Sequence, residues 1–265
     1  MPEKKPLTSV DLQSLIKETF LRDILHFDET DSTNTQSLAL LSTGQSIETP
    51  HLVYAETQTG GRGRGGNSWW SQPGSLTFSV IVDMSELGLT PNQQPQLSLL
   101  TGLAILKTGQ SLLPRADFAV KWPNDVYLAG RKLAGILTEI PPQSNQHAVI
   151  GVGLNVNNAF QHAPEALQQT GISLADLSGQ THSRRDLLKT FLQHLDELFQ
   201  ALSRGEAVLK NWPEFCLLTG KNVTIQAGPN EICGICRGID DTGALLLETD
   251  RGIERMMGGI VANWS

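Results

Sequence analysis

The spacing of hydrophobic positions along the chain predicts both helices and strands. Residues 184–202 carry the clearest helical pattern, with Leu or Phe at every third or fourth position and charged residues between them. Residues 11–25 and 96–113 have similar spacing, so we predict helices there too, the second one buried. Five further apolar stretches predict strands of a buried sheet. These are 51–58, 75–84, 118–122, 132–140 and 147–156.

The pattern changes after Trp212-Pro213. Short strand-like runs fill residues 220–265, separated by turn formers such as Gly228-Pro229-Asn230. Short antiparallel strands in so small a segment predict a β-barrel. We therefore predict an α+β fold: a mixed, mainly antiparallel sheet with flanking helices in residues 1–212, and a small C-terminal β-barrel in residues 213–265.

Composition and charge narrow the classes of function. Hydrophobic residues make up 39% of the chain, enough for a sizeable core, which excludes a wholly disordered protein. The 20 Lys and Arg against 27 Asp and Glu give a net charge of −7. Because affinity for duplex nucleic acid depends on neutralising many phosphates, a general nucleic-acid binder is not expected. An anionic substrate would need a local cluster of Lys and Arg.

The N-terminus and the cysteines predict a cytoplasmic protein. Residues 1–10 lack the apolar segment of a secretory signal, and no run in the chain is long enough for a membrane span. Three cysteines are a sparse, odd set that fits a reducing compartment. Cys233 and Cys236 form a C-x-x-C in an alternating segment, so we expect them on opposite faces of a strand. A zinc or redox site there is the weaker alternative.

The most unusual window is Gly60-Gly61-Arg62-Gly63-Arg64-Gly65-Gly66. Glycine lets backbone N–H groups approach an anion closely, and arginine supplies planar donors that match carboxylate and phosphate oxygens. Ordering seven backbones costs on the order of 7–14 kcal/mol, whereas each charge-assisted hydrogen bond returns about 1.5–3 kcal/mol. We therefore predict an anion-binding loop that is mobile without its ligand and closes over it.

Other interpretations of this loop remain open. Its glycines satisfy the dinucleotide-binding pattern G-x-G-x-x-G, but the turn-like residues that follow do not open the helix which that motif needs. A phosphate P-loop would need a lysine after the last glycine, and Asn67 stands there. An RNA-binding Arg/Gly segment is usually longer and disordered. A plain surface loop would not need two arginines so tightly framed by glycine.

A second basic cluster lies at 121–125 and 130–137. Pro123-Asn124 and Ala129-Gly130 favour turns. The resulting hairpin would place Lys121, Asp125 and Lys132 near one another. Lysines suit a phosphate or carboxylate, and a nearby aspartate can hold Mg²⁺ that bridges phosphates. Alone, the segment would be better explained as a solvated hairpin with scattered ion pairs; paired with the Gly/Arg loop it indicates a site.

These motifs together resemble those of the biotin–protein ligases. The resemblance rests on Asp31-Ser32-Thr33-Asn34, on residues 55–69, on 121–125 with 130–137, and on Gly151-Val152-Gly153-Leu154-Asn155-Val156-Asn157. Residues 238–247 are similar to the small SH3-like domain of that family. The resemblance covers the chain from about residue 27 to its end.

The resemblance implies a two-step reaction and its partners. In the family, the biotin carboxylate attacks the α-phosphate of Mg-ATP to give biotinyl-5′-AMP and pyrophosphate. The mixed anhydride then acylates one lysine of the biotin carboxyl carrier domain of a biotin-dependent carboxylase. The implied ligands are biotin, ATP and Mg²⁺, the implied partner is the carrier domain, and a homodimer stays open.

The resemblance also implies a role for each matching residue. Ser32, Thr33 and Gln58 would bind the ureido ring of biotin, with Asn34 adjacent. Arg62, Gly63 and Arg64 would close over the biotin carboxylate and the phosphates. The remaining roles are Lys132 at the carboxylate, Lys121 at the α-phosphate, Asn124 and Asp125 at Mg²⁺, Trp69 and Asn155 beside the adenosine, and Gly135 with Ile136 and Leu137 in a wall of the biotin pocket.

Simpler explanations exist for several of these positions. Residues 32–34 could only cap a following helix, Gln58 and Asn155 could be ordinary strand-end residues, and Trp69 could be a core aromatic. The family can place an aromatic over the adenine where this chain has Gly171, so the adenine stacking is not explained. Only about thirty residues precede the first motif, so no DNA-binding repressor role is expected.

Two other functions stay open. A related acyl-adenylate ligase would use lipoate or a similar acid in place of biotin. A non-catalytic adaptor would bind proteins through the small barrel and would bind no ATP.

Overall fold

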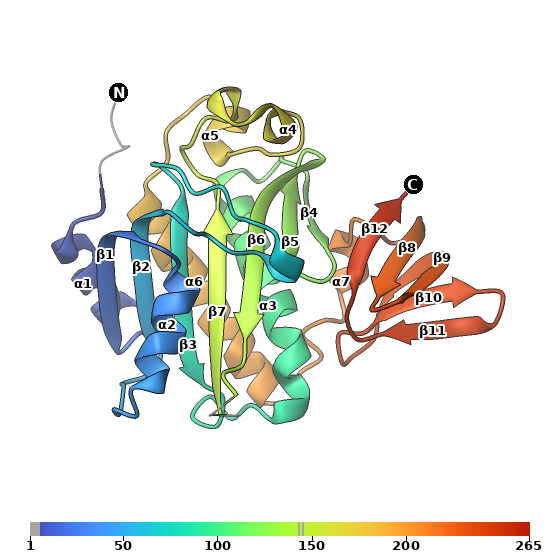
Figure 1. Cartoon of the computed structure of the whole chain (residues 1–265), viewed down its shortest axis with the longest axis horizontal. Coiled ribbons are helices and arrows are strands. Elements are labelled where there is room, and N and C mark those ends of the chain that lie inside the picture. Colours follow the sequence, from blue (N-terminus) through green and yellow to red (C-terminus); the bar gives the residue numbers. More distant parts are fainter. Residues whose placement is uncertain (1–5, 143, 145) are drawn as a thin grey trace.

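The computed structural model describes residues 6–142, 144 and 146–265. Residues 1–5 lie outside the described residues. They belong to the N-terminal stretch in which we expect no secretory signal. The described chain forms a seven-stranded sheet with helices on both faces, and a five-stranded sheet beside it (Figure 1). The predicted α+β class is confirmed.

The large sheet is antiparallel except at one edge. Its order is β1-β2-β3-β7-β6-β5-β4, and only the pair β1–β2 is parallel. Its strands are β1 (Asp23–Thr30), β2 (His51–Gln58), β3 (Leu76–Asp83), β4 (Phe118–Lys121), β5 (Asp125–Leu128), β6 (Arg131–Glu139) and β7 (His147–Leu154). The five strands expected from apolar stretches are β2, β3, β4, β6 and β7, each within two residues of its predicted bounds.

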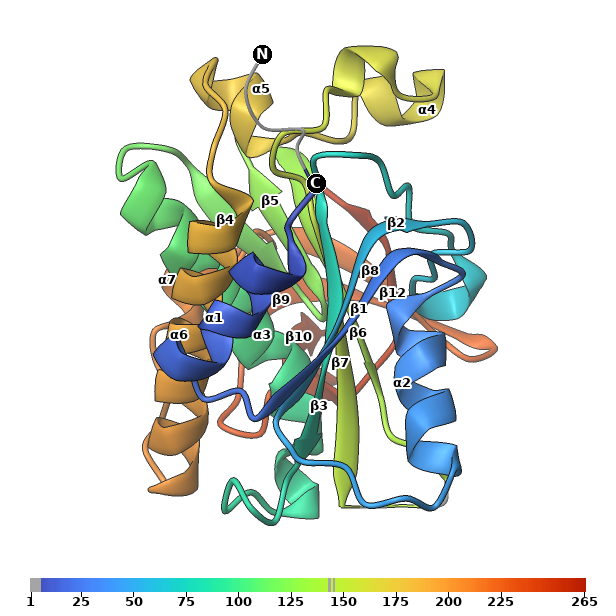
Figure 2. The ribbon, with the colours of Figure 1, turned by 90° about the vertical axis from the view of Figure 1, so that its left-hand side faces the viewer.

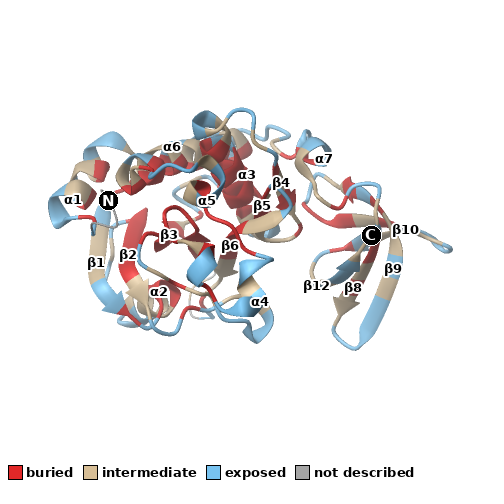
Figure 3. Cartoon of the chain, turned by 90° about the horizontal axis from the view of Figure 1, so that it is seen from above, coloured by how far each residue is buried: buried red, intermediate tan, exposed pale blue. Residues whose placement is uncertain are grey.

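Helices cover both faces of this sheet, as Figure 2 shows. Helices α1 (Ser9–Glu18), α3 (Gln94–Leu112) and α6 (Arg184–Ser203) pack on one face, and α2 (Thr33–Ser42) packs on the other. The short helices are α4 (Glu165–Gln168), α5 (Leu174–Ser178) and α7 (Trp212–Phe215). Buried residues concentrate in β2, β3 and α3, between the two layers (Figure 3).

The predicted helix 11–25 is only partly correct. A capping box in which Thr8 and Asp11 bond each other's backbone begins α1, and the helix ends at Glu18. The apolar residues that follow belong to β1: Leu25 and Phe27 pack beneath α2, whereas Ile24 packs into the core on the opposite face. This alternation is the period of a strand, which the helical spacing of the preceding residues obscures.

The second sheet contains every strand predicted for the C-terminal segment and one more. Strands β8 (Asn222–Ala227), β9 (Asn230–Ile239), β10 (Leu245–Thr249), β11 (Gly252–Met256) and β12 (Ile260–Trp264) form an antiparallel sheet in the order β11-β10-β9-β8-β12. Neither β11 nor β5 was expected as a strand, because they have only five and four residues. Cys236 is buried and Cys233 is exposed, so they do lie on opposite faces. The boundary at residue 212 stays a prediction.

Two kinds of feature are absent from the described residues. None of the helices there combines the length and apolarity that a membrane crossing requires. No three His, Cys, Asp or Glu residues of the described chain lie close enough to hold a metal ion by themselves.

Candidate active site

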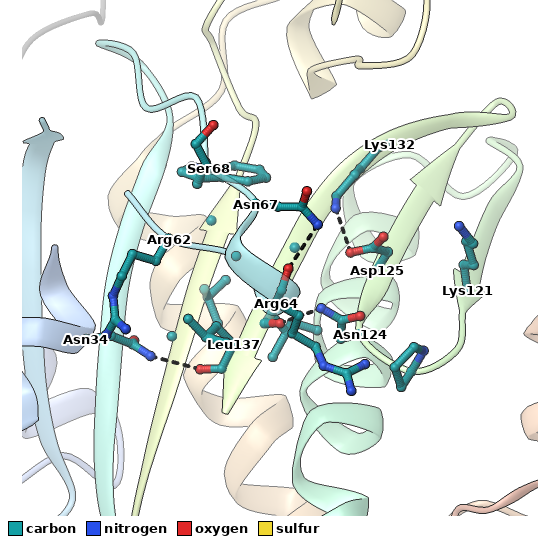
Figure 4. A pocket seen from close by; sticks show the side chains of 18 of the residues that line it. Asn34, Arg62, Arg64, Asn67, Ser68, Lys121, Asn124, Asp125, Lys132 and Leu137 are labelled. Carbon is teal, nitrogen blue, oxygen red and sulfur yellow. Dashed lines mark hydrogen bonds and ion pairs between the residues drawn. The ribbon is translucent and has the colours of Figure 1, made fainter. Parts of the chain in front are cut away.

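A cavity of about 280 Å³ lies over the large sheet (Figure 4), and the start of β12 in the second sheet borders it. Its lining comes from the start of α2, the segment after β2, the β4–β5 hairpin, β6 and β7, and the start of β12. Residues more than 200 positions apart in sequence, such as Ser32 and Ile260, therefore line one cavity. Most of the residues singled out by the sequence motifs line this cavity.

One end of the cavity, which we call the polar end, is lined by Ser32, Thr33, Asn34 and Gln58. Ser32 precedes the first turn of α2, yet its side chain makes no capping bond. Helix capping alone therefore does not explain this motif. The Thr33 amide N–H donates to Gln58 Oε1 at 2.7 Å, and the Thr33 hydroxyl lies 3.1 Å from the same oxygen. The Gln58 amide is thereby fixed with its Nε2 available as a donor.

The orientation of the Asn34 amide follows from its acceptors. Asn34 Nδ2 donates to the Leu137 carbonyl at 3.1 Å and to the Glu139 carboxylate at 2.7 Å. Because both partners only accept, the nitrogen must face them and Oδ1 must face away. Ser79 Oγ, fully buried on β3, donates to that oxygen at 2.6 Å and lies 2.7 Å from Thr33 Oγ1. Gln58, Thr33, Ser79 and Asn34 thus form one continuous hydrogen-bonded series.

The opposite end, which we call the cationic end, gathers Arg64, Lys121 and Lys132 around Asp125. Lys132 Nζ lies 2.7 Å from Asp125 Oδ1, and Lys121 is the cross-strand partner of Asp125. The predicted hairpin and the proximity of these three residues are confirmed. Arg62 is not part of this group: its guanidinium pairs with Glu139 beside the polar end.

Burial changes the acidity of two of these cations. Burial of the Lys121 ammonium lowers its pKa, an effect that nearby Asp125 opposes and Lys132 reinforces. Burial also lowers the pKa of Arg64, again opposed by Asp125. Desolvated cations facing a single carboxylate favour the arrival of further negative charge, because charge interactions strengthen where water is excluded.

The Gly/Arg segment is folded as a short hairpin across the cavity. Gly63 N–H donates to Asn67 O at 2.7 Å, and Trp69 N–H donates to Gly61 O at 2.8 Å. Gly65 and Gly66, at the tip, have φ angles of +64° and +83°, which glycine adopts without strain. Arg64 Nη1 lies 3.5 Å from the Gly259 carbonyl of the C-terminal sheet. Mobility of this hairpin without ligand stays a prediction.

Two glycines of β7 leave room for side chains from other segments to pack against this strand. A Cβ at Gly151 would overlap the Asn34 amide, and a Cβ at Gly153 would overlap the Trp69 indole. Trp69 therefore packs against β7 as part of the cavity wall, and its buried Nε1 has no acceptor among the described residues. The G-V-G motif thus has a steric explanation, and Trp69 is more than a core aromatic.

The remaining predicted residues divide into two groups. Gly63, Gly135 and Asn124 line the cavity, the last donating from Nδ2 to the Ile136 carbonyl at 2.7 Å. Asn155 does not line it: it is buried, and its Oδ1 accepts from Asn158.

Gly171 accommodates an aromatic from another segment. A Cβ there would overlap Phe160, whose ring packs 5.3 Å from that of Trp70. Position 171 therefore carries no aromatic side chain of its own, but the Phe160 ring packs directly against it.

Four parts of the site were not expected. They are Ser79, Glu139, residues 259–261 and Trp264, whose ring centroid lies 3.8 Å from Lys121 Nζ. Glu139 lies two residues beyond the Gly135-Ile136-Leu137 motif, and this closeness was the only sequence feature that could have indicated a role in the site. Trp264 gave none, because only the packing of the two sheets brings it to Lys121.

Family models and curated relatives both relate this chain to biotin protein ligases. Residues 27–155 match the model of the Biotin/lipoate A/B protein ligase family, and residues 218–262 match that of the Biotin protein ligase C terminal domain. The chain is 34% identical over 224 residues to the biotin--[acetyl-CoA-carboxylase] ligase of Mycobacterium tuberculosis, covering 83% of this chain and 81% of that protein. It is 32% identical over 209 residues to the bifunctional ligase/repressor BirA of Bacillus spizizenii, covering 77% of this chain. That match spans 63% of the Bacillus protein.

A solved structure supports the same relationship. The biotin protein ligase of Aquifex aeolicus in complex with biotin and ATP superimposes with a TM-score of 0.78 at 26% identity. The superposition covers 92% of this chain and 98% of that one.

Proposed function

The chain belongs to the biotin protein ligase family, and we propose that it activates biotin with ATP to biotinyl-5′-AMP and transfers the biotin to a lysine of a biotin carboxyl carrier domain. The observation that carries this proposal is the division of one cavity into a neutral polar end and a cationic end. A molecule with a hydrogen-bonding ring and a carboxylate matches the two ends. The Aquifex relative was solved with both biotin and ATP.

The first step needs charge neutralisation and alignment. A biotin carboxylate oxygen attacks the α-phosphorus of ATP, the bond from that phosphorus to the bridging oxygen breaks, and pyrophosphate leaves. Two anions must approach each other, so a cationic end built from Lys121, Lys132 and Arg64 supplies the main electrostatic stabilisation. In the second step a carrier lysine amine attacks the acyl carbon and AMP leaves. Orientation contributes the rest, with no covalent enzyme intermediate.

The polar end is proposed to bind the ureido ring. That ring presents two N–H donors and one carbonyl acceptor, which side-chain hydroxyls and amides can satisfy. Ser32, Thr33 and Gln58 Nε2 supply such groups, and Asn34 is held in the same wall by Ser79 and Leu137. Gly135, Ile136 and Leu137 of β6 form the adjoining side of the pocket.

Trp69 is proposed to border the adenosine, because its indole forms part of the cavity wall. Asp125 offers one half-buried carboxylate beside the cavity, and Asn124 keeps its Oδ1 for a further ligand because its Nδ2 is committed to Ile136 O. Such a donor set suits Mg²⁺ that arrives with nucleotide phosphates, since this ion usually takes one or two protein carboxylates. When bound, Mg²⁺ would neutralise phosphate charge. We also propose a cytoplasmic location, from the three free cysteines.

The decisive experiment has two stages. Purified protein with labelled pyrophosphate should exchange the label into ATP when biotin is present and not when lipoate replaces it. The same protein with biotin and ATP should then label one lysine of a purified carrier domain. Exchange that depends on lipoate alone would show that the acid substrate is lipoate and not biotin. Absence of both exchange and ATP binding would indicate a non-catalytic adaptor protein.

Trp264→Ala tests the contribution of the C-terminal sheet to ATP use. The indole holds Lys121 through a cation–π contact, which contributes about 0.5–2 kcal/mol depending on exposure. We expect the KM for ATP to rise about 3- to 10-fold, with the KM for biotin little changed. Trp264→Phe keeps an aromatic face and should restore most of the affinity. An equal rise in both KM values would contradict this assignment.

A further inference from the structure

The Glu139 carboxylate connects two parts of the site that the sequence motifs treat separately. Glu139 is the last residue of β6, at the polar end of the cavity. One oxygen accepts from Asn34 Nδ2 at 2.7 Å, and both oxygens pair with Arg62, at 3.2 Å to Nη1 and 2.9 Å to Nη2. One side chain thus holds a polar-end residue and an arginine of the Gly/Arg hairpin.

These contacts extend the hydrogen-bonded series of the polar end. It runs from Gln58 through Thr33, Ser79 and Asn34, and Glu139 carries it to Arg62. The hairpin therefore attaches at its base to the wall that would contact the biotin ring. At its tip, the hairpin rests near Gly259 and Ile260.

The base of the hairpin determines where its tip lies. Arg62 and Arg64 are two residues apart on one arm of a hairpin closed by the Gly63–Asn67 and Gly61–Trp69 backbone bonds. If the Arg62 side chain is fixed at Glu139, Arg64 at the tip stays near the Gly259 carbonyl and within the electrostatic influence of Asp125. A two-oxygen contact with a guanidinium fixes direction as well as distance.

We propose that Glu139 is a positioning residue: through Arg62 it holds the Gly/Arg hairpin closed over the cavity, and through Asn34 it couples that closure to the occupied polar end. This inference rests on the proposed biotin ligase function. Its expected consequence is retention of biotin and of biotinyl-5′-AMP, with little effect on the chemical step itself.

The Arg62–Glu139 ion pair is placed to affect how long the ligand is retained more than how stable the fold is. The Arg62 side chain is 43% exposed and that of Glu139 is 26% exposed, and ion pairs in such contact with solvent contribute little to folding. Loss of the pair should leave the fold intact and change how long the hairpin stays closed.

Two substitutions at this position separate its two contacts. Glu139→Gln keeps an oxygen that can accept from Asn34 but removes the charge that pairs with Arg62. Glu139→Ala removes both contacts. Arg62→Gln removes the other partner, and the double variant Arg62→Gln with Glu139→Gln tests whether Glu139 acts through Arg62. Glu165→Gln, an exposed carboxylate on α4, is the matched control.

The experiment measures biotin-dependent pyrophosphate exchange and the rate at which preformed biotinyl-5′-AMP leaves each variant. For Glu139→Gln we expect the KM for biotin and the release rate each to rise about tenfold, the scale of one lost charge-assisted contact, with kcat within about threefold of the wild type. Glu139→Ala should raise the KM further. The double variant should be no worse than Arg62→Gln alone, and Glu165→Gln should match the wild type.

Three kinetic results would overturn the inference while leaving the proposed function in place: wild-type retention in Glu139→Gln, effects that add in the double variant, or a lower KM for biotin in Glu139→Gln. The last would mean that Glu139 competes with the ligand for Arg62. A fall in the free energy of unfolding that accounts for the change would also overturn it. A wild-type protein that shows no biotin-dependent exchange would instead refute the proposed function, and this inference with it.

Discussion

Replacing Lys132 with alanine is expected to slow formation of biotinyl-5′-AMP by about 30- to 1,000-fold. This range corresponds to a loss of about 2–4 kcal/mol of transition-state stabilisation, the scale for removing one donor aimed at developing charge. Lys132 faces the cavity in an ion pair with Asp125, so its removal takes away that carboxylate's ion-pair partner and one positive charge where a carboxylate and a phosphate are proposed to meet. Pyrophosphate exchange at saturating biotin and ATP measures the effect.

Three companion variants make this prediction specific. Arg64→Ala should cause a loss in the same range, because Arg64 belongs to the same cationic end. Lys132→Arg keeps the charge and should recover part of the rate. Unfolding in urea should show little change for Lys132→Ala, since the Lys132 side chain is 37% exposed. Near-wild-type exchange in both alanine variants would remove these two residues from the catalytic group.

Gly153→Ala is expected to lower kcat/KM for ATP by about 100-fold, the scale on which a misplacement of about 1 Å acts in a catalytic site. A methyl group at Gly153 would overlap the Trp69 indole, so the ring must leave the face of β7. Displacing it would change the wall proposed to border the adenosine. The kinetics of exchange at varied ATP measure the change.

Two controls connect this loss to the ring. Adding Gly153→Ala to a Trp69→Ala variant should cost little more, because no ring remains to be displaced. Gly258→Ala meets no atom within 4 Å and should behave like the wild type. Full additivity with Trp69→Ala would show that the methyl group acts elsewhere, for example on the sheet itself.

The sequence predicted most of the fold because its elements are long and buried on at least one face. Helix α6 and strands β2, β3 and β7 have clear periodicity or continuous apolar runs, and all four were predicted. Strands β1, β5 and β11 were missed as strands. Strand β1 alternates weakly and pairs with β2, which lies beyond α2 in sequence. Strands β5 and β11 pair with neighbours adjacent in sequence, but they have only four and five residues, too few to show a clear period.

The candidate site was predicted where its residues are adjacent in sequence and missed where packing assembles them. The hairpin that places Lys132 beside Asp125 follows from two local turns. The arrangement of Arg62 did not follow, because its partner Glu139 lies 77 residues away at the end of another strand. Asn155, expected beside the adenosine from its motif, accepts from Asn158 outside the cavity lining, and its role at the adenosine stays a prediction.

The separation of the cavity into two ends has a practical consequence for redesign. The polar end is built on α2, β2 and β3, whereas most of the cationic end is built on β4, β5 and β6. Substitutions at Thr33 or Ser79 therefore change the end proposed for the vitamin ring while keeping all three cations proposed to meet the phosphates. An engineered enzyme that attaches a synthetic acid to a protein tag would best begin with a library at those positions.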